Sequence, residues 1–229
     1  MPTLTRTGDV FILDLGDTEN RFHPDWLVSM TAALDEVTGA EGPRALVTSA
    51  TGKFWTNGLD LDWLSTHADR SSSYAVTVHE LLARILELPM PTVAAVQGHA
   101  FAAGGMLALA HDFRVMRADR GYFCLPEVDI RIPFTAGMSA LIQSRLQPQV
   151  AHEAMTTGHR YGGAEALAAG IVDLTAGDGE VLNVAVTRAA ALTAKATPAL
   201  GTIKQRMYRP VLSALRQAGS DDFVPALTT

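Results

Sequence analysis

The stretch from Pro91 to Ile130 constrains the fold more than any other part of the chain. An apolar run at Thr92–Gln97 predicts a buried strand, and the next segment, Gly98–Gly105, is almost entirely glycine and alanine. A helix is expected from about Ala103 to Ala110, with a second strand after it. Small residues at such a turn let the backbone pass close to packed neighbours or to a ligand.

The start of this helix and an acid further along together suggest chemistry. Free N–H groups and the positive end of a helix dipole lie at a helix N-terminus, where they can hold negative charge on an oxygen. Glu127 follows among apolar neighbours (Leu125, Val128 and Ile130), a setting that tunes a carboxyl group for proton transfer. Its local sequence alone fits a salt-bridged structural acid equally well. Asp129 would share its side of an extended segment, which leaves a supporting role open.

Strands alternate with helices as far as about residue 175, which predicts the α/β class. Further strands are expected at Val10–Leu15, Ala45–Ser49 and Ile171–Leu174. Helical spacing begins at Pro24, Tyr74, Phe134 and Pro148, and the tail beyond residue 179 is predicted to be helical. We therefore expect a core over residues 1–175 and a helical region over residues 176–229.

The loop Ala50–Asp60 is the second informative segment. It follows a predicted strand, and α/β folds commonly place ligand sites at the carboxyl ends of strands. Asn57-Gly58 is a tight-turn signal. The N–H of Leu59 could point to the same place as those near Ala103, although spacing alone favours a simple strand-to-helix turn.

Composition excludes several classes of protein. The chain has 229 residues, a net charge of −6 and one cysteine, Cys124, so an intrachain disulfide framework and a multi-cysteine zinc site are excluded. No basic stretch indicates nucleic acid, no histidine lies in a metal-ligand pattern, and no apolar run approaches the ~20 residues of a membrane helix. The N-terminus shows no targeting signal, so a cytoplasmic location is expected.

Three blocks, in order, resemble the crotonase, or enoyl-CoA hydratase/isomerase, superfamily. They are Lys53–Leu61, Ala95–Gly105 followed by His111-Asp112, and Gly158–Asp173. Each block alone is a weak signal, but three in order are a strong one, and the resemblance runs from about Val10 to Asp173. It implies a spiral of β-β-α units with a C-terminal helical region, usually assembled as homotrimers or hexamers.

The resemblance also implies a reaction. Family members stabilise a thioester enolate, and the matching backbone N–H donors here are those of Leu59 and Ala103. Hydratases of the family use two glutamates; the first position aligns with Met106 and the second with Glu127. One base is enough to shift a double bond, which is the pattern of Δ3,Δ2-enoyl-CoA isomerases. The run His111–Ile130 looks especially like the plant-type branch of these isomerases.

The resulting hypothesis is an isomerase that acts in fatty-acid degradation and in which Glu127 is ionised at rest. Alternatives are another crotonase reaction, including a hydratase with an unusual second acid, and a non-catalytic acyl-CoA-binding subunit. No cofactor is expected, because coenzyme A is part of the acyl-CoA substrate. Chain length and double-bond geometry are not determined.

The same resemblance suggests which residues contact substrate. The residues expected to shape the substrate and CoA site are Lys53, Phe54, Asn57, Gly58, Asp60, Gly104 and Phe134. Lys53, Lys204 and Arg206 are candidates for the CoA phosphates.

Overall fold

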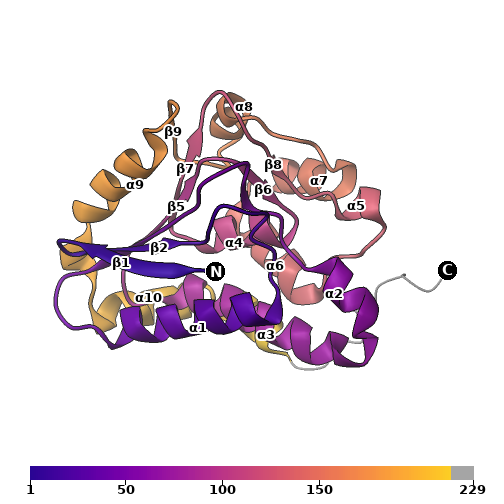
Figure 1. The fold of residues 1–229 in the computed structure, drawn as a ribbon, viewed down its shortest axis with the longest axis horizontal. Coiled ribbons are helices and arrows are strands. Elements are labelled where there is room, and N and C mark those ends of the chain that lie inside the picture. The colour runs from indigo at the N-terminus through magenta and orange to yellow at the C-terminus, as the bar shows by residue number, and fades with distance from the viewer. Residues whose placement is uncertain (218–229) are drawn as a thin grey trace.

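Residues 1–217 are described by a computed structural model, which contains two sheets (Figure 1). The larger sheet has the order β1-β2-β3-β5-β7-β9, and the smaller has the order β4-β6-β8. All neighbours are parallel except β1 and β2. The strands are β1 (Thr3–Thr7), β2 (Val10–Asp14), β3 (Ala45–Ser49), β4 (Phe54–Thr56), β5 (Thr92–Val96), β6 (His99–Phe101), β7 (Phe113–Arg117), β8 (Phe123–Cys124) and β9 (Leu174–Ala176).

The helices cover the two sheets and make up the whole described chain after β9. They are α1 (Pro24–Gly39), α2 (Leu61–Thr66), α3 (Ser71–Glu87), α4 (Ala103–Ala110), α5 (Glu127–Ile130), α6 (Ala136–Arg145), α7 (Pro148–Thr157), α8 (Gly163–Ala168), α9 (Val181–Ala190), α10 (Pro198–Met207) and α11 (Arg209–Arg216). Two short 3₁₀ turns, Ala68–Arg70 and Thr193–Lys195, join neighbouring helices.

The predicted spiral of β-β-α units is confirmed. Three times in succession a strand of the large sheet is followed by a shorter strand of the small sheet and then by helix: β3-β4-α2, β5-β6-α4 and β7-β8-α5. The second strand of each unit was not predicted, because two or three residues show no periodicity. The predicted loop Ala50–Asp60 contains β4, and the predicted turn Gly98–Gly105 contains β6.

Alternate side chains of the large sheet enter two separate apolar clusters, as the period of two in a strand requires. Leu46 and Ala94 enter the main core together with residues of α1, α3 and α4. Val47 and Val93 point to the opposite face, where α9 contributes Val181, Ala185 and Ala189. Figure 1 shows α9, in orange, beside β5, β7 and β9.

The end of the described chain packs back on the core. A Cβ added at Gly137 of α6 would lie 2.8 Å from the Cα of Leu215 on α11, so these two helices touch closely. The predicted boundary at residue 175 falls inside β9, and the division into two regions stays a prediction. The strand predicted at Ile171–Leu174 is displaced, because pairing with β7 begins only at Leu174.

Candidate active site

The loop Asn57–Asp60 and the N-terminus of α4 meet, as the resemblance implied. A Cβ at Gly58 would lie 2.9 Å from the Ala103 nitrogen, and the φ angle of Gly58 is +78°. Within residues 1–217, neither the Leu59 nor the Ala103 N–H donates a hydrogen bond to another residue. Two unused donors therefore lie on segments in direct contact, which suits an anionic oxygen.

Close contacts between backbones hold this arrangement. A Cβ at Gly104 would lie 2.5 Å from the carbonyl oxygen of Thr56, so α4 rests directly on the end of β4. Gly104 is thus required by packing, whatever its contact with substrate. Asp60 accepts a hydrogen bond from the Trp63 N–H at 3.1 Å and thereby caps α2.

Glu127 is the first residue of α5, and its side chain is unusual for a carboxylate. The residue is 6% exposed, and Oε2 is buried without a hydrogen-bond partner among the described residues. Burial raises the pKa of Glu127 to about 8. Burial thus favours the neutral acid over the carboxylate in the ligand-free protein, and the hypothesis that Glu127 is ionised at rest stays a prediction.

Glu127 and the Leu59 loop line one cavity of about 380 Å³. Of the residues proposed from the sequence, Asn57, Leu59 and Glu127 line it, and Ala102 brings the start of α4 to its wall. The full lining is Arg21, Asn57, Leu59, Leu61, Asp62, Phe101, Ala102, Cys124, Pro126, Glu127, Ile130, Ile132 and Arg160. An acid, two amide-bearing segments and an apolar wall thus surround a single space.

Phe134 does not line this cavity but a second one of about 450 Å³. Glu127 and Ile132 line both cavities, so the two spaces are neighbours. The second cavity is otherwise lined by Val128, Arg131, Pro133, Phe134, Ser139 and Met155. A predominantly apolar space therefore continues past the acid.

Lys53 and Phe54 line neither of these two cavities. Lys53 is exposed, and its Nζ lies 5.2 Å from the ring centroid of Phe54. Their assignment to the CoA site stays a prediction.

Lys204 is buried, unlike Lys53. It is 4% exposed, and its Nζ donates to Asp112 at 2.6 Å and to the Met90 carbonyl at 2.8 Å. Its proposed contact with CoA phosphates is wrong in this fold, because that ammonium is already buried and paired.

Four other residues named in the sequence analysis have different surroundings from Glu127. Asp129 is exposed on α5, which is a helix rather than the extended segment assumed from the sequence. Met106 is fully buried in α4. Cys124 lines the first cavity, and burial raises its thiol pKa to about 11. His111 is buried, and its ring nitrogens make hydrogen bonds with the Thr48 hydroxyl at 2.8 Å and the Leu107 carbonyl at 2.8 Å, so its role is structural.

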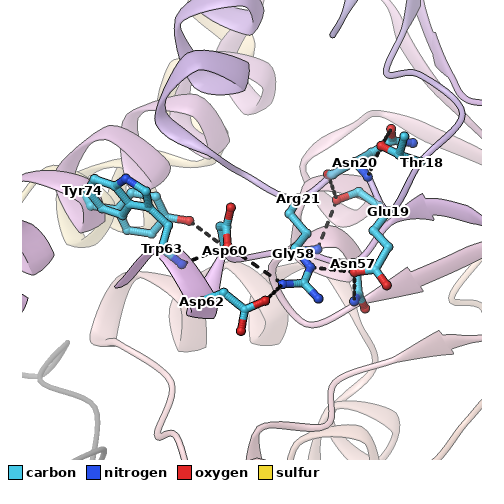
Figure 2. Close-up of polar contacts among 11 residues, drawn as sticks. Thr18, Glu19, Asn20, Arg21, Asn57, Gly58, Asp60, Asp62, Trp63 and Tyr74 are labelled. Atoms are coloured by element: carbon cyan, nitrogen blue, oxygen red, sulfur yellow. Dashed lines mark hydrogen bonds and ion pairs between the residues drawn. The ribbon is translucent and has the colours of Figure 1, made fainter. Parts of the chain in front are cut away.

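Two arginines of the cavity were not anticipated. Arg21 lies in the turn-rich segment before α1 and pairs with both Glu19 and Asp62 (Figure 2). Arg160 lies 5.9 Å from the ring centroid of Phe101. The one available signal was the position of Arg160 inside the third block. No sequence signal pointed to Arg21, because its partner Asp62 lies 41 positions further along the chain.

The fold and the site define a class of protein. The family model described as "Enoyl-CoA hydratase/isomerase" matches residues 9–222, and the chain belongs to this family. Enoyl-CoA delta isomerase 2, peroxisomal, of Arabidopsis thaliana is 40% identical over 190 residues, which is 79% of each chain. Enoyl-CoA delta isomerase 3 of the same plant is 37% identical and covers 91% of this chain and 92% of its own.

Solved structures agree with the fold. An apo enoyl-CoA isomerase of Mycobacterium tuberculosis superposes with a TM-score of 0.85 at 26% identity, covering 94% of each chain. A family protein of Pseudomonas syringae reaches 0.88 at 24% identity, covering 95% of this chain and 94% of its own. The second comparison supports the fold alone.

Two features are absent from residues 1–217. No group of three or more histidine, cysteine, aspartate or glutamate side chains there could hold a metal ion. No helix in the same range is long and apolar enough to cross a membrane. The expected absence of a metal and of a cofactor stays a prediction.

Proposed function

We propose that this protein is a Δ3,Δ2-enoyl-CoA isomerase. Membership of the enoyl-CoA hydratase/isomerase family supports an acyl-CoA substrate. The plant relatives named enoyl-CoA delta isomerases support a double-bond shift within that family. The resemblance to the plant-type branch, seen in the sequence, agrees with both.

One observation carries the proposal. Glu127, whose Oε2 has no hydrogen-bond partner among residues 1–217, lines a cavity that is also lined by Leu59, whose N–H donates to no other described residue. At the position where a hydratase has its first glutamate, Met106 is buried and has no proton to exchange. A single acid/base beside an oxyanion site supports proton shuttling rather than the activation of water.

The reaction that follows balances without a cofactor. Glu127 in its carboxylate form takes a proton from C2 of a 3-enoyl thioester, and the electron pair moves onto the thioester oxygen. The N–H groups of Leu59 and Ala103 stabilise the resulting dienolate. Glu127 then returns the proton to C4, so the double bond ends between C2 and C3. An acid whose Oε2 has no hydrogen-bond partner among residues 1–217 suits this role, because the carboxyl group must reach two carbons in turn.

Asp62 is the candidate for the second acid that a hydratase would need. It is the other carboxylate that lines the cavity, but its Oδ2 is engaged by Arg21. Water addition would need Asp62 to leave that ion pair. We therefore place hydration below isomerisation. Binding without turnover is also placed below it.

Product analysis separates these functions. Purified protein is incubated with a 3-enoyl-CoA, and in parallel with a 2-enoyl-CoA, and products are resolved by chromatography and mass. Formation of 2-enoyl-CoA of unchanged mass supports the isomerase. A product heavier by one water supports the hydratase, and unchanged substrate that remains bound supports a non-catalytic subunit.

The biological setting is part of the same proposal. A 2-enoyl-CoA product would enter fatty-acid β-oxidation, so the reaction prepares unsaturated chains for that pathway. A homotrimer or hexamer and a cytoplasmic location stay our expectations, although some relatives are named peroxisomal. The oligomer can be measured by light scattering.

A further inference from the structure

The direction of the Leu59 N–H is determined by the peptide group to which it belongs. That N–H shares a planar unit with the carbonyl of Gly58, and in a trans peptide the two bonds point in opposite directions. The Phe22 N–H donates to the Gly58 oxygen at 2.8 Å. Holding this oxygen therefore holds the N–H at the other end of the unit, and it also polarises the donor.

The Ala103 N–H is held in the same way, but by its own helix. It shares a peptide unit with the Ala102 carbonyl, which accepts the Met106 N–H at 3.2 Å as part of the first turn of α4. Leu59 precedes α2 and has no such helical turn behind it. Its alignment must be supplied by other parts of the chain.

Tyr74 of α3 supplies one of these supports. The Asp60 N–H, which is the next peptide donor after Leu59, donates to the Tyr74 hydroxyl at 3.0 Å. Leu59 therefore stands between two peptide units that are each held by a hydrogen bond. Tyr74 is 4% exposed and does not line the cavity, and its hydroxyl reaches the loop through this hydrogen bond with Asp60 (Figure 2).

Asn20 supplies the opposite support, because it fixes the segment that carries Phe22. Its Nδ2 donates to the carbonyls of Trp55 at 3.0 Å and Gly16 at 3.2 Å. It is 3% exposed and has a φ angle of +50°, a left-handed conformation that asparagine tolerates. The segment is thus bound to β4, the strand that leads into the Leu59 loop.

We propose that Tyr74 and Asn20 are positioning residues for the Leu59 oxyanion donor. Each acts at a distance from substrate: Tyr74 through Asp60, and Asn20 through Phe22. The inference deepens the proposed function and rests on it, because it takes the Leu59 N–H to hold the thioester oxygen.

The first test is Tyr74→Phe, which deletes one hydroxyl and keeps the ring. Loss of a whole oxyanion donor costs about 10²–10³ in rate, so misalignment of one donor is expected to lower kcat about 10-fold. KM should change less than about twofold, because substrate in its ground state bears little charge on that oxygen. Tyr161→Phe is the matched control: Tyr161 is also buried, and its hydroxyl donates to Glu153 at 2.6 Å, away from both donor segments.

A second readout separates alignment from stability. A 3-ketoacyl-CoA ionises to an enolate with its charge shared by the thioester oxygen, and the enolate is seen by its ultraviolet absorbance. Wild-type protein and Tyr161→Phe should hold a larger share of bound 3-ketoacyl-CoA as enolate than Tyr74→Phe does. A purely structural role for Tyr74 would lower the melting temperature and leave this share unchanged.

Asn20→Gly repeats the test from the other side if Tyr74→Phe does not fold, because glycine accepts the left-handed backbone. The inference would be overturned if Tyr74→Phe had the same kcat and the same enolate share as the Tyr161→Phe control. If Tyr74→Phe does not fold, the same comparison is made between Asn20→Gly and that control. A failure of the proposed function looks different: wild-type protein would not isomerise 3-enoyl-CoA, whereas the enolate comparison among variants would still report donor alignment.

Discussion

The two sides of the cavity are built in opposite ways. The donor side, which consists of the loop Asn57–Asp60 and the N-terminus of α4, is held by backbone contacts and by a hydrogen bond on each flanking peptide. The acid side is the four-residue helix α5, whose Glu127 carboxyl oxygen Oε2 has no partner among residues 1–217. The difference teaches how such a site divides its work: donors must be fixed before charge develops, whereas a proton carrier must remain free to move.

Replacement of the acid should have the largest effect. Glu127→Gln keeps the size of the side chain but removes the exchangeable carboxyl proton, so kcat for 3-enoyl-CoA should fall about 10³–10⁴-fold. Enolate formation by bound 3-ketoacyl-CoA, which depends on the donor side, should persist. A variant that keeps most of the wild-type activity would remove Glu127 from the role of base.

The same substitution should change the pH dependence of stability. The pKa of Glu127 rises from 4.5 to about 8 on folding, so the favourable neutral form is fully present below pH 4.5 and its contribution is lost as pH rises toward 8. The cost reaches at most about 5 kcal/mol in the free energy of unfolding. Denaturant unfolding at pH 5 and pH 8 should show a steeper loss for the wild type than for Glu127→Gln. Parallel curves would mean that the carboxyl group is not destabilised by burial.

Gly58→Ala tests the donor side. The new Cβ would lie 2.9 Å from the Ala103 nitrogen and would force the two donors apart, so kcat should fall about 10–100-fold. Gly42→Ala is the control, because Gly42 has a φ angle of +80° with nothing within 4 Å of the added Cβ. It should cost about 1 kcal/mol of stability and leave kcat unchanged. Equal kcat of the two variants would show that the close approach of Gly58 to Ala103 does not align the donors.

The smallest expected effect is on the pH profile. The value of kcat/KM, which reports the free enzyme, should rise about tenfold between pH 7 and pH 9 around a midpoint near 8, because the base form of Glu127 is the active one. Steady-state rates across this range check the prediction. A flat profile would support the hypothesis of an acid ionised at rest.

Local pattern was sufficient for much of this protein. Helix α1 begins at Pro24, as expected from the preference of proline for the first helical position. The start of α4 at Ala103 was also predicted. Strands β4, β6 and β8 were not, because they are two or three residues long and are stabilised by pairing with each other.

Through its resemblance to the family, the sequence by itself implied the β-β-α fold, the acid Glu127 and the two donor segments, because that resemblance depends on residue type and order along the chain. Only the tertiary structure decided the pKa of the acid and the orientation of the Leu59 donor. The pKa of Glu127 is raised because distant segments exclude water from its carboxyl group, and desolvation depends on the whole surrounding fold. The aim of the Leu59 N–H likewise depends on Phe22 and Tyr74, which are brought to it by long-range packing.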